Sequence, residues 1–198
     1  RYIQKSMGRG SYGVTYSICV NQNDPSTCSA VAKVVHVARN ETKERVRTLE
    51  EMDFRMECAI ANHASEQGYG PKIRNMFMCR GPGGVYGVLI MERLYRTAFE
   101  MKKELTESDC RAMARVMNLM HNAGVWHTDL HLSNIMQRAD QSFCIIDFGN
   151  AWPLFTSVPP LLRMVDFESW IHDLGRAPLQ RFLETEVAEG LYGSTYRE

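Results

Sequence analysis

The sequence predicts an α+β fold in which one domain is divided into two lobes. Three observations support this prediction. Segments rich in β-branched and aromatic residues dominate the first half of the chain, and a single long run at helical spacing interrupts them. Helical signals dominate the second half. The chain of 198 residues is long enough to bury a core, and we expect the lobes to span about residues 1–94 and 95–198.

The amino-terminal lobe is expected to contain a five-stranded sheet and one helix. Glycine-rich or polar loops separate the strands, as is typical of hairpins. The expected strands are residues 2–7, 13–20, 29–37, 72–79 and 84–94. The helix is expected from Glu44 to Ala64, where apolar residues recur at helical spacing. These recurring residues are Leu49, Met52, Met56 and Ile60.

The carboxy-terminal lobe is expected to be reduced and mainly helical. Its first helix, at residues 106–124, opens with a Thr106-x-x-Asp109 capping signal and ends on Gly124. The remaining expected elements are a short strand at 142–148 and helices around 164–175 and 178–190.

Charge balance and cysteine spacing limit the classes of function. The 23 Lys and Arg residues balance the 23 Asp and Glu residues, so no global field attracts nucleic acid or an anionic membrane. No apolar run is long enough for a membrane span, and the amino terminus has no signal-peptide pattern. The sequence begins with Arg1, so we expect it to be part of a longer chain. Its six cysteines occur singly, without a C-x-x-C pair, which predicts free, mostly buried thiols and an intracellular, cytoplasmic location.

A glycine-rich segment, GRGSYG, lies between the first two expected strands. Gly8, Gly10 and Gly13 match the pattern G-x-G-x-x-G. A dinucleotide-binding fold would require a helix after these glycines, but here a β-branched and aromatic strand follows. That context favours a hairpin whose backbone N–H groups approach nucleotide phosphates. Taken alone, the segment is better explained as an ordinary tight hairpin.

Lys33 is a charged residue inside the otherwise apolar strand AVAKVV. Glu57 on the long helix could pair with Lys33, which would satisfy both groups. Glu50 and Glu51 are alternatives for that role. The simpler interpretation is a lysine on an edge strand that reaches solvent.

The segment HTDLHLSNIM, from His127 to Met136, concentrates polar side chains after the helix at 106–124. Its two histidines are four residues apart and would share one face of a helix, as in a zinc site. The segment lacks the helix-internal Glu of H-E-x-x-H, which argues against zinc. Further on, Asp147 in IIDFG ends an apolar strand, a position that suits either a cation ligand or a simple turn.

In this order, the motifs resemble the signature set of protein kinases. The set consists of a glycine-rich loop, a strand Lys, a helix Glu, H-x-D-L-x-x-x-N and D-F-G, and it extends over roughly Met7 to Trp170. The resemblance implies a two-lobed protein-kinase-like fold. It also implies that the segment from His127 to Met136 is the catalytic loop.

The resemblance places a set of residues at ATP. In it, Lys33 would bind the α and β phosphates while Glu57 holds Lys33. Met91 would guard the back of the pocket, and backbone groups of Glu92 and Leu94 would bind adenine. The full set is Gly8, Gly10, Gly13, Thr15, Ala32, Lys33, Glu57, Met91, Glu92, Leu94, Met136 and Asp147.

The resemblance also assigns roles in catalysis, beside that of Lys33. Asp129 would accept the proton of the attacking hydroxyl group. Asn134 and Asp147 would coordinate Mg²⁺ at the phosphates. His131, where a Lys is usual, would neutralise charge on the transferring phosphate as an imidazolium, or would only hydrogen-bond the loop or face solvent. Asp166 would brace the catalytic loop.

Several positions depart from the family pattern. Thr15 replaces a Val of the glycine loop, and Thr128 replaces the Arg of H-R-D. Nothing matches A-P-E, and the stretch from Asn150 to Val165 is short, so we expect constitutive activity without phosphorylation there. In its compactness the chain resembles Rio-type kinases, the small kinases of tRNA-modification complexes and kinases of large DNA viruses. Its HTD and GNAW segments resemble those of the kinases that phosphorylate SR splicing factors.

The implied function is Mg·ATP-dependent transfer of the γ-phosphate to a hydroxyl, expected to be Ser or Thr of a protein. One alternative is a small-molecule kinase of the aminoglycoside or choline kinase type, which has a similar catalytic loop. The D-F-G sequence argues against it. The other alternative is a pseudokinase that binds nucleotide without turnover, and the presence of every residue that the chemistry needs argues against that.

Overall fold

The structure is a computed structural model of the chain and describes residues 2–10, 13–21, 23–40, 43–154 and 156–175. It divides into two compact units. The first comprises Arg1–Glu66 and Pro71–Arg93, and the second comprises Gln67–Gly70 and Leu94–Glu198. Strands and helices occur in both units, so the predicted α+β class is confirmed.

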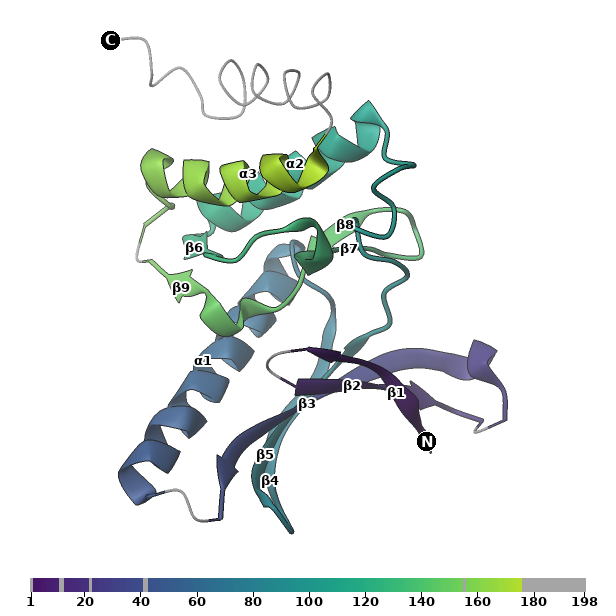
Figure 1. Cartoon of the computed structure of the whole chain (residues 1–198), viewed down its shortest axis with the longest axis vertical. Coiled ribbons are helices and arrows are strands. Elements are labelled where there is room, and N and C mark those ends of the chain that lie inside the picture. Colours follow the sequence, from purple (N-terminus) through teal and green to yellow (C-terminus); the bar gives the residue numbers. More distant parts are fainter. Residues whose placement is uncertain (1, 11–12, 22, 41–42, 155, 176–198) are drawn as a thin grey trace. The chain divides into compact units, whose positions relative to one another are not determined.

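The first unit is built on an antiparallel sheet with the strand order β1-β2-β3-β5-β4 (Figure 1). Short connections join β1 to β2 and β4 to β5, as the glycine-rich turns predicted. The strands are β1 (Tyr2–Gly10), β2 (Gly13–Cys19), β3 (Cys28–Arg39), β4 (Ile73–Gly81) and β5 (Gly84–Glu92). A single 3₁₀ turn, η1 (Pro25–Thr27), lies between β2 and β3.

Helix α1 (Glu44–Gln67) packs on the sheet, and Ile60 is the one residue of the predicted apolar repeat that lies on its buried face. Leu49, Met52 and Met56 are about half exposed, at 55%, 59% and 49%. The buried face of α1 consists of Phe54, Glu57, Cys58, Ile60, Ala61 and Ala64. A Cβ atom on Gly87 of β5 would lie 2.5 Å from the Phe54 ring, so the glycine makes room for this contact. The helix was correctly predicted, and its orientation depends on the sheet beneath it.

Cys19 and Cys28 form a disulfide bond between β2 and β3. The antiparallel pairing of these strands places the two residues opposite each other, although they are nine positions apart in the sequence. The prediction that all six thiols are free was therefore wrong, and the cysteine pattern no longer indicates a reducing compartment. The cysteines outside the disulfide are Cys58, Cys110 and Cys144, which are buried, and Cys79, which is exposed.

The second unit contains two helices and short strand pairs. Helix α2 (Glu107–Asn122) begins with the predicted capping box, in which Thr106 and Asp109 exchange hydrogen bonds. Gly124 has a φ of +77°, and a Cβ there would lie 2.7 Å from two backbone oxygens, so only glycine fits this exit from the helix. The strands are β6 (Val125–Trp126) with β9 (Trp152–Pro153), and β7 (Ile135–Gln137) with β8 (Phe143–Ile145).

Helix α3 (Pro160–Leu174) packs against α2 (Figure 1). Its buried residues include Asp166, Phe167 and Trp170. The expected helix at 178–190 lies outside the described residues. No helix in the described part of the chain is long and apolar enough to cross a membrane.

Candidate active site

The ion pair between Lys33 and Glu57 is the main polar feature of the first unit. The Nζ atom of Lys33 on β3 lies 2.6 Å from Oε1 of Glu57 on α1. Both side chains are largely buried, with exposed fractions of 15% and 8%. A buried ammonium group requires an anionic partner, and this contact selects Glu57 over the alternatives Glu50 and Glu51.

Strand register shows which residues share a sheet face with Lys33. Residues directly opposite each other point to the same face, and neighbours along a strand alternate. Thr15 pairs with Lys33, and Met91 pairs with Val31, two residues before Lys33, so these four residues share a face. Ala32 lies on the opposite face. Val31 was missed in the sequence, although its spacing of two from Lys33 was a usable signal.

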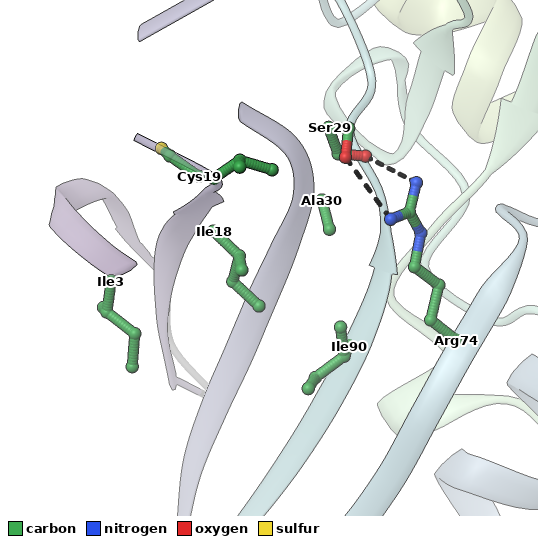
Figure 2. A pocket seen from close by; sticks show the side chains of 8 residues that line it. Ile3, Ile18, Cys19, Ser29, Ala30, Arg74 and Ile90 are labelled. Carbon is green, nitrogen blue, oxygen red and sulfur yellow. Dashed lines mark hydrogen bonds between the residues drawn. The ribbon is translucent and has the colours of Figure 1, made fainter. Parts of the chain in front are cut away.

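The face that carries Ala32 has a pocket of about 270 Å³ (Figure 2). Its apolar lining includes Ile3, Ile18, Ala30 and Ile90. At its edge, Arg74 donates a 2.9 Å hydrogen bond to the backbone oxygen of Ser29. Because Ala30 alternates with Val31 and Lys33 along β3, this pocket does not share a face with the Lys33–Glu57 pair.

The glycine-rich segment forms the β1–β2 hairpin. Gly8 pairs with Thr15, and Gly10 pairs with Gly13; residues 11 and 12 lie outside the described residues. A Cβ on Gly13 would lie 2.5 Å from the backbone oxygen of Val34, so packing against β3 alone requires this glycine. The requirement at Gly13 therefore does not depend on a phosphate.

The predicted hinge comprises the end of β5 and the residues after it. The N–H group of Glu92 donates to the backbone oxygen of Lys72 at 2.9 Å, and the Glu92 carboxylate accepts from the Lys72 N–H at 2.9 Å. The Glu92 N–H is therefore committed to holding the end of the sheet. Leu94 is buried. It is the first residue of the segment Leu94–Glu198, which belongs to the second unit.

In the second unit, Asn134 organises the segment that holds Asp129. Its Nδ2 atom donates to the backbone oxygen of Asp129 at 2.9 Å and lies 3.2 Å from Nε2 of His131. Asn134 is buried, whereas the Asp129 side chain is 50% exposed. The spacing of five residues thus lets a buried amide hold the backbone of an exposed carboxylate. His131 Nε2 also lies 3.7 Å from Oδ1 of Asp129.

Asp166 of α3 holds the beginning of the same segment. Its carboxylate accepts the N–H groups of His127 at 3.2 Å and Thr128 at 3.1 Å, and it lies 2.9 Å from Nε2 of His121. Thr128 has a φ of +68°, an unfavourable conformation for a β-branched residue. Its hydroxyl donates to the backbone oxygen of Asn150 at 2.9 Å, which ties this segment to the residues after Asp147.

His127 is a core residue, not a metal ligand. It is fully buried, and its Nε2 lies 3.0 Å from the backbone oxygen of Ile146. Burial lowers the pKa of His127 below its usual value of 6.5, more than the nearby carboxylates raise it, so the imidazole is neutral and Nε2–H donates. No helix places His127 and His131 on one face. Among the described residues, no group of three His, Cys, Asp or Glu side chains could hold a metal.

The pairing of β7 with β8 brings the backbone that precedes Asp147 to Asn134. The N–H of Ile146 donates to the backbone oxygen of Asn134 at 2.9 Å. Asp147 itself is left-handed, with φ 65° and ψ 64°, and its side chain does not cap the following turn, η3 (Phe148–Asn150). Mg²⁺ prefers oxygen ligands and few protein side chains, so Asn134 Oδ1 and the Asp147 carboxylate fit this ion.

Two further features complete this region. Phe148 is buried, with its ring centroid 6.1 Å from that of Tyr69 and 5.5 Å from that of His127. Met136 on β7 is partly buried and pairs with Cys144. The predicted residues thus form two groups, one in each unit: a Lys–Glu pair on a sheet, and an Asp–Asn–Asp group.

Comparison with known proteins identifies the family that the chain resembles. The model of the protein kinase domain family matches residues 2–160. Calcium-dependent protein kinase 19 of Oryza sativa subsp. japonica is 25% identical over 161 residues, and mitogen-activated protein kinase sma-5 of Caenorhabditis elegans is 25% identical over 155 residues. Calcium-dependent protein kinase 33 of Arabidopsis thaliana is 24% identical over 163 residues.

These matches cover 73% to 74% of the chain but only 27% to 28% of each relative. The matched part therefore spans little more than a quarter of the length of the curated relatives.

Proposed function

The chain belongs to the protein kinase family, and from this membership we propose that it transfers the γ-phosphate of ATP to a serine or threonine hydroxyl of a protein. The observation that carries the proposal is the arrangement around Asn134. One buried amide holds the backbone of the exposed Asp129, and the residue before Asp147, Ile146, donates its N–H to the backbone oxygen of the same Asn134. An exposed carboxylate beside two oxygen ligands for a cation suits phosphoryl transfer to a hydroxyl group.

Each group has a role in this proposal. Bound Mg²⁺ would neutralise phosphate charge, and Asn134 and Asp147 would hold it. Asp129 would orient the acceptor hydroxyl and take its proton. Lys33, fixed by Glu57, would bind the phosphates of the nucleotide.

The nucleotide-binding residues of the first unit are proposed from the face that they share. Thr15, Val31 and Met91 lie on the face of Lys33, and we include Val31 in place of Ala32 for this reason. The protein substrate is proposed from the family and from the relatives, all of which are protein kinases by name. Thr128 and His131, at positions where Arg and Lys are usual, make this an atypical member.

The test is phosphate transfer from radiolabelled Mg·ATP to the protein itself, to generic protein acceptors and to small molecules. Asp129→Asn should retain nucleotide binding but slow transfer by roughly 10²–10⁴, the scale for loss of a positioned base. Asp53→Asn, at an exposed aspartate of α1, is the matched control and should transfer at the wild-type rate.

Three results would contradict the proposal. Wild-type protein that binds ATP but labels nothing would indicate a pseudokinase. Label confined to aminoglycosides or choline would indicate a small-molecule kinase. An Asp129→Asn variant with wild-type transfer would show that Asp129 is not the base.

A further inference from the structure

Leu132 lies in the middle of the catalytic segment, and both of its backbone groups are bound within the protein. The residue is fully buried. Its N–H donates to Oδ2 of Asp173 at 3.1 Å, and its carbonyl oxygen accepts from the N–H of Phe99 at 3.1 Å. A buried N–H requires such a partner, because leaving it unpaired costs about 1–3 kcal/mol.

Asp173 and Asp166 lie on the same side of α3. They are seven residues apart, which is about two helical turns, so their directions differ by only about 20° and their positions by about 10 Å. Asp166 accepts the N–H of Thr128, four residues before Leu132. Four residues span at most about 14 Å, so the chain from Thr128 to Leu132 is long enough to reach both carboxylates.

The turn held by Asp173 carries the proposed metal ligand. Leu132 opens the 3₁₀ turn η2 (Leu132–Asn134), and His131 precedes it in an extended conformation. Asn134 ends the turn, and its amide holds Asp129. Any shift of the N–H at Leu132 therefore moves the ligand Asn134 and loosens the backbone of Asp129.

We propose that Asp173 is a positioning residue for phosphoryl transfer, because its carboxylate fixes the turn that places Asn134 at the metal ion. Helix α3 then holds the catalytic segment at two points, through Asp166 at its start and through Asp173 at this turn. The role in transfer rests on the proposed kinase function. The hydrogen bond between Leu132 and Asp173 can be tested independently of it.

The experiment is a double-mutant cycle with Leu132→Pro and Asp173→Ala. Proline lacks an N–H and is tolerated at the first position of a helical turn. The preceding His131 has φ −126° and ψ 169°, which is compatible with a following proline. In the proline background Asp173 has no N–H to accept, so its removal should have no further effect.

Two readouts are needed. Asp173→Ala should raise the Mg²⁺ concentration for half-maximal transfer roughly tenfold, the scale of one lost charge-assisted hydrogen bond, with a smaller effect on kcat at saturating Mg²⁺. It should also speed deuterium uptake by the peptide containing His131 to Asn134. Asp173→Asn retains an acceptor oxygen and should remain near wild type. Glu168→Ala, at an exposed residue of the same helix, should change neither readout.

The outcomes separate the two proposals. Wild-type protein without phosphate transfer would overturn the kinase function. Faster deuterium uptake in Asp173→Ala would still support the hydrogen bond between Leu132 and Asp173, which we call the brace. Unchanged uptake in Asp173→Ala, or an equal change in both backgrounds, would overturn the brace. Normal transfer and Mg²⁺ requirement in Asp173→Ala despite faster uptake would overturn the positioning role. If Leu132→Pro does not fold, wild-type behaviour of Asp173→Asn beside an impaired Asp173→Ala supports the brace, and equal impairment of both overturns it.

Discussion

Replacement of Asp166 by alanine should destabilise the second unit by about 3–5 kcal/mol. The carboxylate is 1% exposed and has three partners, namely Nε2 of the buried His121 and the N–H groups of His127 and Thr128. Each buried donor left without an acceptor costs about 1–3 kcal/mol, which gives an upper range of about 3–9 kcal/mol. Relaxation around the smaller side chain lowers this figure to the range measured when one partner of a buried charged network is removed.

Such a loss is a large part of a typical folding free energy of about 5–15 kcal/mol. The assay is urea unfolding followed by tryptophan fluorescence. All three tryptophans, Trp126, Trp152 and Trp170, belong to the second unit, so the signal reports on that unit. Asp166→Asn should lower the free energy of unfolding less than Asp166→Ala does, because the amide oxygen still accepts a hydrogen bond. Some loss remains, since the amide NH₂ group faces another donor and cannot accept from it.

Glu168→Ala is the control for this measurement, since Glu168 is exposed on the same helix. Its unfolding midpoint should match that of the wild type. An Asp166→Ala variant that unfolds within about 1 kcal/mol of the wild type would refute the reasoning, because three donors, two of them buried, cannot lose their acceptor at so small a cost.

Three further predictions concern pH, regulation and thiol reactivity. Burial lowers the pKa of His127 in the folded state, so the unfolded state binds more protons below pH about 6.5, and the free energy of unfolding should fall there by up to about 1.4 kcal/mol for each unit that the pH is lowered. His127→Phe should flatten this slope in urea titrations from pH 7.5 to 5.5. Equal slopes in the variant and the wild type would contradict the assignment. The Thr128 hydroxyl donates directly to the Asn150 carbonyl, so this connection needs no phosphate group, and phosphatase treatment should leave the rate of phosphate transfer unchanged. Thr128→Val, which removes the hydroxyl, should slow transfer roughly 2–10-fold. Activity that depends on phosphorylation between residues 150 and 165 would contradict this prediction. Native protein should be alkylated at the exposed Cys79 but not at Cys58, whose pKa burial raises to about 11, and mass spectrometry of the alkylated peptides checks this.

The sequence by itself determined the types of the main elements and the order of the motifs. The capping box of α2 and the glycine after it depend on residues within one turn of each other, so no distant contact was needed to predict them. The β1–β2 hairpin follows from local turn chemistry in the same way. Lys33, Glu57 and the spacing of Asp129 and Asn134 could also be identified from the sequence, because the spacing of residues within a motif does not depend on the fold.

Tertiary structure decided which way each element faces and which residues meet. The packing of Phe54 against Gly87 fixes the rotation of α1 about its axis, so the buried face includes Ile60 of the predicted apolar repeat but not Leu49, Met52 or Met56. Side chains alternate between the two faces of a strand, so strand register places Val31, and not Ala32, on the same sheet face as Lys33.

Two pairings were equally invisible along the chain. Cys19 lies opposite Cys28 only because β2 and β3 pair antiparallel. Asp173 accepts the N–H of Leu132, which is 41 positions away in the sequence. Neither pair has a sequence pattern of its own, because register and helix packing arise from many weak contacts that form together only when the chain is folded.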